Sequence, residues 1–234
     1  MERNKNTMNN IDTCIYTNIC NLHNTKDCDE DCLRYIEIMH LLNKSNIPKN
    51  MQKPIDLYPD NVDYDAFVKL KHIKTSIKEW VDDKCFNLYI YSNHTGNGKT
   101  SWAIKLLLKY FDSIWAGNGL QVRGLFINVP TFLARLKDFN NIDLQFNELK
   151  NTIPNVDLIV WDDISSTKVS DYDNSQLLNY IDQRILNGKS NIFTSNLDGD
   201  KLKEILGNRL ASRIWNNSIK IELKGKDRRG DIVD

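Results

Sequence analysis

A glycine-rich segment near the middle of the chain combines residue types that bind phosphate. Gly96, Gly98, Lys99 and Thr100 follow an apolar run at 88–91. The two glycines allow the backbone to curl so that its N–H groups converge on phosphate oxygens, and the N-terminus of a following helix favours the same anions. Lys99 would then reach the β and γ phosphates of a nucleotide, and Thr100 would ligate Mg²⁺. This is the pattern of a Walker A loop, except that Asn93 stands where the first glycine is usual; a glycine-rich turn before a helix is the alternative.

Two aspartates follow a second apolar run further along the chain. The run at 158–161 ends in Asp162 and Asp163. A buried strand of this kind can deliver one carboxylate to the Mg²⁺ shell and a second to polarise the attacking water. We therefore assign Asp162 to Mg²⁺ and Asp163 to the water, as in a Walker B motif; a pair of aspartates that caps the next loop is the alternative. The predicted nucleotide-binding residues are Thr95, Gly96, Asn97, Gly98, Lys99, Thr100, Ser101 and Asp162, with Thr100 and Asp162 as magnesium ligands.

Two amides also follow predicted strands. Asn196 comes after the strand at 191–194, and Asn128 lies at the end of the strand at 125–129. Ligands bind at the carboxyl ends of strands in open α/β sheets. We therefore predict that Asn196 senses phosphate and that Asn128 contacts Asp163; plain turn formation is the alternative for Asn196.

Arg209 and Arg213 are four residues apart, which places them on one face of a helix. An arginine that reaches the γ-phosphate bound by a neighbouring subunit stabilises charge in the transition state. We predict that Arg213 is this arginine finger, and this prediction implies an oligomer. The predicted catalytic residues are thus Asp163, Asn196 and Arg213. A surface arginine pair bridged to acidic residues is the alternative.

The N-terminal segment concentrates four of the five cysteines, Cys14, Cys20, Cys28 and Cys32. In a reducing cytoplasm such a cluster suggests a metal before disulfides, and four soft donors suit tetrahedral Zn²⁺. His23 could replace one of the four ligands. Reduced structural cysteines and a disulfide pair are the alternatives. We expect Cys85, which stands alone, to be a small buried hydrophobe.

These residues require a scaffold that brings the ends of several strands together. Apolar strands at 86–91, 125–129, 158–161 and 191–194 alternate with helical patterns at 100–111, 131–139 and 175–186. Such alternation predicts an α/β fold with a parallel sheet flanked by helices, as in P-loop NTPases.

The part of the chain before this alternation divides into two segments. Residues 1–44 hold the cysteines and a helix predicted at 33–42, and residues 45–64 carry prolines that favour an extended linker. Asp65 is predicted to cap a helix whose apolar positions run from Phe67 to Val81. Residues 65–234 would then form the ATPase domain, with a reduced or absent C-terminal lid.

Composition places the chain among ordinary globular proteins. It has 234 residues, of which 41% are hydrophobic and 26% charged, and its formal net charge is zero. Any contact with DNA must therefore come from a local basic patch. The first residues lack the apolar stretch of a signal peptide, and no apolar run is long enough to span a bilayer, so we expect a cytoplasmic protein without membrane contact.

Taken in order, these motifs resemble AAA+ replicative-helicase loaders of the DnaC and DnaI type, and especially phage-encoded DnaC-like replication proteins. The resemblance covers nearly the whole chain. It rests on the cysteine-rich start and on residues 45–48, 95–100, 126–130, 160–163, 194–196, 209–213 and 224–229.

The resemblance implies a role that the motifs alone could not supply. In that family the N-terminal domain, zinc-bearing in some members, binds a hexameric DnaB-type helicase, and the AAA+ domain binds ATP and single-stranded DNA while the ring is deposited at the fork. It implies an ATPase with ATP, Mg²⁺ and Zn²⁺ as cofactors, and a homo-oligomer in the ATP-bound state. Candidate DNA contacts are the helix after Pro130 or the basic tail residues Lys220, Lys224, Lys226, Arg228 and Arg229. Asn93 and the short stretch after Asn196 depart from the wider AAA+ pattern.

Two other functions remain open from the sequence. A transposition-helper ATPase of the IstB type shares the AAA+ core, although the cysteine cluster counts against it. A zinc-stabilised adaptor whose altered phosphate loop no longer turns over nucleotide is the other.

Overall fold

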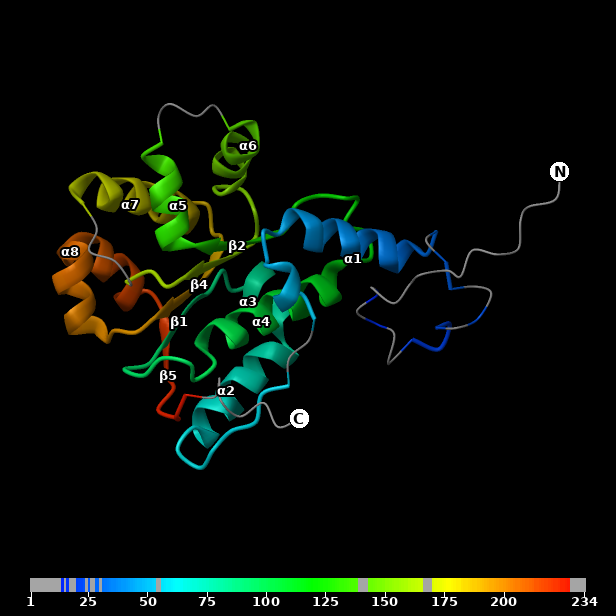
Figure 1. Ribbon diagram of the computed structural model, residues 1–234, viewed down its shortest axis with the longest axis horizontal. Helices are drawn as coiled ribbons and strands as arrows, with labels where there is room; N and C mark the ends of the chain where they lie inside the picture. The colour runs from blue at the N-terminus through cyan, green and yellow to red at the C-terminus, as the bar shows by residue number, and fades with distance from the viewer. Residues whose placement is uncertain are drawn as a thin grey trace.

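A parallel β-sheet lies at the centre of the molecule (Figure 1). The computed structural model describes residues 14, 16, 20–23, 25, 28–29, 31–53, 56–138, 143–165 and 170–227. Within these ranges the sheet has five strands in the order β2-β3-β4-β1-β5, and every neighbouring pair is parallel. The strands are β1 Asn87–Tyr91, β2 Gly124–Asn128, β3 Leu158–Asp162, β4 Ser190–Ser195 and β5 Ile219–Glu222.

Helices cover both faces of this sheet. Alternate residues of each strand point to opposite faces, so the strands contribute side chains to two separate cores. Leu88 and Val160 face a core formed with the helices between residues 33 and 114. Tyr89, Ile159 and Trp161 face a second core formed with the helices between residues 129 and 216. Burial on both faces explains why β2 and β3 are nearly continuous apolar runs. The predicted α/β fold with a parallel sheet flanked by helices is therefore confirmed.

Three of the described α-helices precede β1, and the other five lie between successive strands. They are α1 Leu33–Lys44, α2 Tyr64–Thr75, α3 Ile77–Asp82, α4 Lys99–Ile114, α5 Val129–Leu136, α6 Leu144–Thr152, α7 Asp171–Leu186 and α8 Gly199–Asn216, with a short 3₁₀ helix η1 at Lys49–Met51. Among the described helices, none has the length and apolar character needed to cross a bilayer.

The helix predicted from Asp65 differs from the observed one in two respects. It is divided into α2 and α3 at Ser76, whose backbone is not helical. The N-cap position of α2 belongs to Asp63, and Asp65 lies in the first turn. The prediction of Asp65 as the cap was therefore wrong, although the apolar positions that it preceded are buried as expected.

The N-terminal segment is attached to the end of α4. Asp112 of α4 accepts hydrogen bonds from the Tyr16 hydroxyl at 2.8 Å and from Arg34 of α1 at 2.9 Å. The Arg34 guanidinium also lies 3.6 Å from the centre of the Tyr16 ring. Since α1 shares a hydrophobic cluster with α4, this segment is continuous with the core.

The start of the predicted linker packs against the edge strand β2. The Phe126 N–H donates to the Ser45 carbonyl at 2.7 Å, and the Asn46 side chain donates to the Phe126 carbonyl at 3.2 Å. Ser45 and Ile47 are both buried. These bonds cover part of an edge that would otherwise expose unpaired backbone groups. A domain boundary at residues 44 and 45 stays a prediction.

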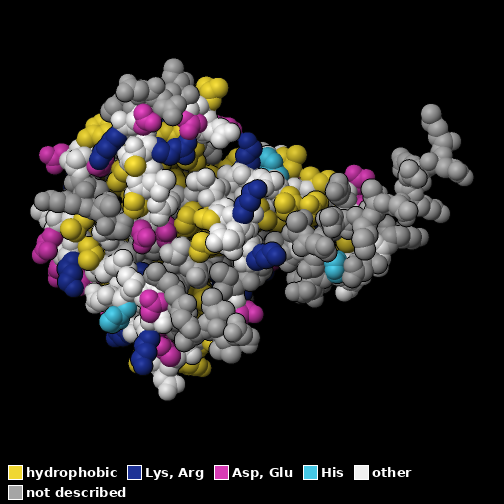
Figure 2. Space-filling model, viewed as in Figure 1, with side chains coloured by type: hydrophobic (Ala, Val, Ile, Leu, Met, Phe, Trp, Pro, Cys, Tyr) yellow, Lys and Arg dark blue, Asp and Glu magenta, His cyan; other side chains and the backbone are white. Residues whose placement is uncertain are grey.

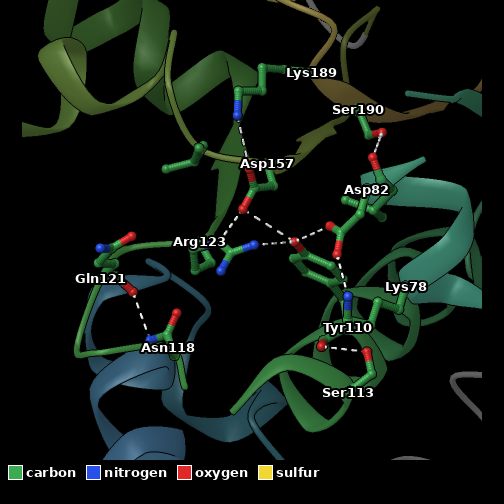
Figure 3. Close-up of polar contacts among 12 residues, drawn as sticks. Lys78, Asp82, Tyr110, Ser113, Asn118, Gln121, Arg123, Asp157, Lys189 and Ser190 are labelled. Carbon is green, nitrogen blue, oxygen red and sulfur yellow. Dashed lines mark hydrogen bonds and ion pairs between the residues drawn. The ribbon is translucent and has the colours of Figure 1, made fainter. Parts of the chain in front are cut away.

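An ionic network fastens α4 to the amino edge of the sheet (Figure 3). Asp157, just before β3, accepts hydrogen bonds from Arg123 and, at 2.9 Å, from Lys189. The Tyr110 hydroxyl of α4 lies 3.2 Å from Asp157 and 2.8 Å from Asp82. Burial alone would raise the pKa of Asp157, but the hydrogen bonds from Lys189 and Arg123 outweigh it and hold this pKa below its usual range. Asp157 is therefore a carboxylate at neutral pH.

Arg184 of α7 is fully buried beside this network. Its guanidinium donates to the carbonyls of Ile153 at 2.6 Å, Val156 at 2.8 Å and Ser190 at 2.5 Å. It also donates to the Asn191 side chain at 2.7 Å. Burial lowers the pKa of Arg184 to about 9, which keeps the side chain charged at neutral pH.

We expect the Arg184→Met substitution to destabilise the protein by about 2–5 kcal/mol, because it leaves several buried acceptors without a donor. Urea unfolding followed by circular dichroism measures this change. Arg209→Met is the matched control, since Arg209 is exposed, and it should change the free energy of unfolding by less than about 0.5 kcal/mol. Equal midpoints for the two variants would contradict a structural role for Arg184.

Candidate nucleotide-binding site

A cleft with a volume of about 420 Å³ lies at the carboxyl edge of the sheet. Its lining residues are Met51, Thr95, Gly96, Asn97, Gly98, Lys99, Thr100, Ser101, Asp163 and Asn196. The fold thus brings the predicted phosphate loop together with the two residues predicted to act on water and phosphate. Met51, which sequence reasoning missed, comes from η1 and adds an apolar side chain to the cleft.

The loop between β1 and α4 depends on two glycines. Gly96 has φ 73° and Gly98 has φ 98°, a region that residues with side chains rarely occupy. Gly98 is also the N-cap of α4, so the helix begins directly at Lys99. The φ angle of Asn93 is not positive. Its backbone therefore does not need the conformational freedom of the missing first glycine.

Lys99 and Asn97 hold the loop together from inside. The Lys99 ammonium donates to the His94 carbonyl at 2.7 Å and to the Asn97 side-chain oxygen at 3.2 Å. Asn97 is fully buried and donates to the Ser92 hydroxyl and, at 3.0 Å, to the Leu223 carbonyl. The Asn97 side chain therefore ties the phosphate loop to the end of β5, a role that the motif pattern did not reveal.

A buried carboxylate connects the loop with the two central strands. Asp162 Oδ1 accepts hydrogen bonds from the Thr100 hydroxyl at 2.7 Å and from the Thr194 hydroxyl at 2.8 Å. Asp162 is the last residue of β3, and Asp163 follows it with φ 55°. One hydroxyl and one carboxylate side by side are the oxygen donors that Mg²⁺ uses at phosphate sites. The residues present therefore suit a Mg²⁺–nucleotide complex.

The backbone on both sides of Asn196 is held in place. The Ser195 hydroxyl contacts the Ser165 hydroxyl and accepts the Leu197 N–H at 2.9 Å. The Leu197 carbonyl accepts the Tyr89 hydroxyl at 2.9 Å. These bonds hold Asn196 at the end of β4, where it lines the cleft.

The Asn128 side chain caps a helix. Its oxygen accepts the Thr131 N–H at 3.2 Å and the Thr131 hydroxyl at 2.8 Å. This is the N-cap of α5, with Pro130 near the start of the helix. The expected contact between Asn128 and Asp163 stays a prediction.

The segment after β5 lies against the phosphate loop. The Asp63 carboxylate, fully buried, accepts the N–H groups of Lys224 at 2.6 Å and Gly225 at 3.0 Å. A Cβ atom added to Gly96 would lie only 1.7 Å from an Asp227 carboxylate oxygen. Gly96 is thus required for a close approach as well as for its φ.

The two arginines of α8 lie outside the lining of the cleft. Arg213 is half-exposed, and its guanidinium pairs with Asp182 of α7 at 2.8 Å. Arg209 is exposed and follows the kink of α8 at Gly207, where φ is 73°. The role of Arg213 in a neighbouring subunit stays a prediction.

The expected zinc site is not supported. Cys14, Cys20, Cys28 and Cys32 are all described, yet no group of three or more His, Cys, Asp or Glu side chains in the described ranges could hold a metal ion. Cys14 and Cys20 pack against the hydrophobic core. Burial raises the pKa of Cys14, and the charges of the three other thiols raise it further. His23 is in no such group either, and none of the five cysteines forms a disulfide.

Cys85 also differs from its prediction. It is exposed and has φ 49°, because it lies in the tight turn between α3 and β1. The expectation of a buried position was therefore wrong.

Among the described candidate DNA contacts, the cations after Pro130 are paired with carboxylates, whereas the described lysines of the tail are exposed. Arg135 and Lys137, after Pro130, are paired with Asp143 and Asp173. Lys220, Lys224 and Lys226 are exposed, whereas Arg228 and Arg229 lie outside the described residues. Figure 2 shows Lys and Arg side chains interspersed with Asp and Glu on the visible face.

Comparison with known proteins supports the resemblance of the motifs. No protein-family model matches the chain. The replicative helicase loader DnaC of Buchnera aphidicola subsp. Baizongia pistaciae (strain Bp) is 28% identical over 151 residues, which cover 62% of this chain and 57% of that protein. The match therefore spans little more than half of the length of this relative.

Solved structures of two loaders share the fold. The crystal structure of the DnaC helicase loader has a TM-score of 0.60 and 22% sequence identity, and the match covers 72% of this chain and 94% of that one. The crystal structure of DnaI has a TM-score of 0.61 and 19% identity, with 78% and 94% covered. In sequence and in fold, the chain is thus similar to AAA+ replicative helicase loaders of the DnaC and DnaI type.

Proposed function

We propose that this chain is an ATP-hydrolysing AAA+ loader of a DnaB-type replicative helicase. The observation that carries the nucleotide part is the 2.7 Å contact between Thr100 and Asp162 beside a cleft lined by the phosphate loop. A hydroxyl at the start of α4 and a carboxylate at the end of a buried strand are the two groups that this chemistry needs next to the metal.

Each group in the cleft has a distinct part in the proposed reaction. The backbone N–H groups of residues 95–100 would bind the phosphates, and Lys99 would leave its two contacts within the loop to reach the β and γ phosphates. Thr100 and Asp162 would hold Mg²⁺, whose charge stabilises the phosphates when it is bound. Asp163 would orient the attacking water and accept its proton. Asn196 would donate a hydrogen bond to the γ-phosphate.

The loading part of the proposal rests on the similarity to DnaC and DnaI. The N-terminal segment with α1 would contact the helicase, and the ATP-bound protein would form a homo-oligomer that also contacts single-stranded DNA. The contact of α1 with α4 through Arg34, Asp112 and a shared hydrophobic cluster supports this proposal. It offers a mechanical connection between the helicase contact and the helix that begins at the phosphate loop.

The Lys99→Ala substitution should weaken ATP binding by about 100-fold, because it removes the only side-chain cation of the loop. Titration of a fluorescent ATP analogue measures the affinity. Lys203→Ala, which removes an exposed lysine of α8, is the control and should bind ATP as the unaltered protein does. Tight Mg²⁺-dependent binding by Lys99→Ala would exclude the assigned role of the loop.

Arg213→Ala should leave ATP binding unchanged and lower turnover by about 1000-fold if this arginine acts on a neighbouring subunit. Asp182→Asn is the matched control, because it breaks the ion pair of Arg213 and keeps the arginine. Steady-state ATPase assays at several protein concentrations test both variants. Normal turnover by Arg213→Ala, or an equal loss in Asp182→Asn, would rule out the finger assignment.

The loading function predicts that the purified chain and a DnaB-type hexamer co-elute in the presence of ATP. It also predicts that the chain places this hexamer on circular single-stranded DNA, and that Lys99→Ala fails to do so. Size-exclusion chromatography and DNA pull-down measure the two steps. Binding to a transposase instead would favour the IstB-type helper, and helicase binding without any ATP turnover would favour the adaptor.

A further inference from the structure

Thr194 belongs to a segment that carries the resemblance, but no role has been assigned to it. It is the second-last residue of β4 and is fully buried. Its hydroxyl donates to Asp162 Oδ1 at 2.8 Å and accepts the Asp163 N–H at 3.0 Å. One hydroxyl therefore contacts both residues of the proposed magnesium and water site.

The backbone of Thr194 adds a second contact with the same turn. Its carbonyl accepts the Ile164 N–H at 3.1 Å. Asp163 has φ 55°, which is unfavourable for a residue with a side chain and needs support from its surroundings. Thr194 thus accepts the N–H groups of Asp163 and Ile164, and these two bonds fix the backbone from which the Asp163 side chain extends.

The hydroxyl of Thr194 also restrains the orientation of the Asp162 carboxylate. Thr100 and Thr194 donate to the same oxygen of Asp162, at 2.7 and 2.8 Å. If Thr100 ligated Mg²⁺ in place of this bond, the hydrogen bond from Thr194 would remain. A carboxylate whose second contact persists keeps its orientation, which is how outer contacts tune a metal site.

We propose that Thr194 is a positioning residue that holds Asp162 toward Mg²⁺ and Asp163 toward the attacking water. This inference rests on the proposed ATPase function and adds a residue to it. Asn196 lies two residues beyond Thr194, directly after β4 ends at Ser195, so the group proposed to sense phosphate and the group that positions the carboxylates lie at the same end of this strand. A shift of β4 on nucleotide binding would therefore reach both acids directly.

The test compares Thr194→Val, which removes the hydroxyl at nearly constant volume, with Thr194→Ser, which keeps it. Binding of a fluorescent ADP analogue is titrated with Mg²⁺, and kcat and KM for ATP are measured. Thr194→Val should require about tenfold more Mg²⁺ for half-maximal binding, as expected when a contact behind a metal ligand is lost. Its kcat should fall by about 10- to 100-fold with little change in KM. Thr194→Ser should restore most of the Mg²⁺ affinity and most of kcat.

Two further variants separate positioning from general stability. Ser190→Ala removes another buried hydroxyl of β4, one that bonds to the Val81 carbonyl at the opposite edge of the sheet. It should keep the Mg²⁺ dependence of the unaltered protein. Thr194→Ala repeats the loss of the hydroxyl, so that a folding defect specific to valine does not decide the result.

Unchanged Mg²⁺ dependence and kcat in Thr194→Val, or an equal defect in Ser190→Ala, would overturn the role of Thr194. The unaltered chain is measured first. If it shows no Mg²⁺-dependent nucleotide binding, the proposed function fails and this inference falls with it. If it binds normally while Thr194→Val is unimpaired, only the inference fails.

Discussion

One carboxylate oxygen joins the three elements on which the candidate site depends. Oδ1 of Asp162 accepts hydrogen bonds from one hydroxyl at the start of α4 and one near the end of β4, so the ends of two strands and one helix meet at a single atom. Because the strands are parallel, their carboxyl ends lie at one edge, and buried hydroxyls there can satisfy a buried charge. The cleft owes its shape to this convergence.

The opposite edge of the sheet is held by charge of a different kind. There Arg184 donates hydrogen bonds to backbone carbonyls before β3 and at the start of β4. Asp157 accepts hydrogen bonds from Arg123, just before β2, and from Lys189, just before β4. A buried cation with several acceptors is costly to disrupt because each partner would be left unpaired. The ionic contacts thus hold the strands together at the amino edge of the sheet, and the candidate site lies at the carboxyl edge.

The features that could be predicted from sequence are those coded by adjacent residues. The apolar run before Asp162 and the glycines before Lys99 specify a strand and a loop locally, and both are present. Strand β5 has two exposed residues and a short length, so no apolar pattern indicated it. The bonds of Asn97 to Leu223 and of Thr194 to Asp162 join residues that are distant in sequence, and only the pairing of strands reveals them. The cysteine cluster suggested a metal because spacing alone cannot show that Cys14 and Cys20 pack, partly buried, against the hydrophobic core.

The strand order has a consequence for the time at which the phosphate loop forms. Strand β1, which precedes the loop, pairs only with β4 and β5, so Leu88 has Ile192 and Ile219 as its partners. A chain that leaves the ribosome N-terminus first exposes β1 well before either neighbour has been made, and contacts over such separations form slowly. The most locally coded part of the protein is therefore among the last to become ordered. A nascent chain that stops before β5 would contain every residue of the phosphate-binding pattern and would still lack the anchor at Leu223 that holds the loop.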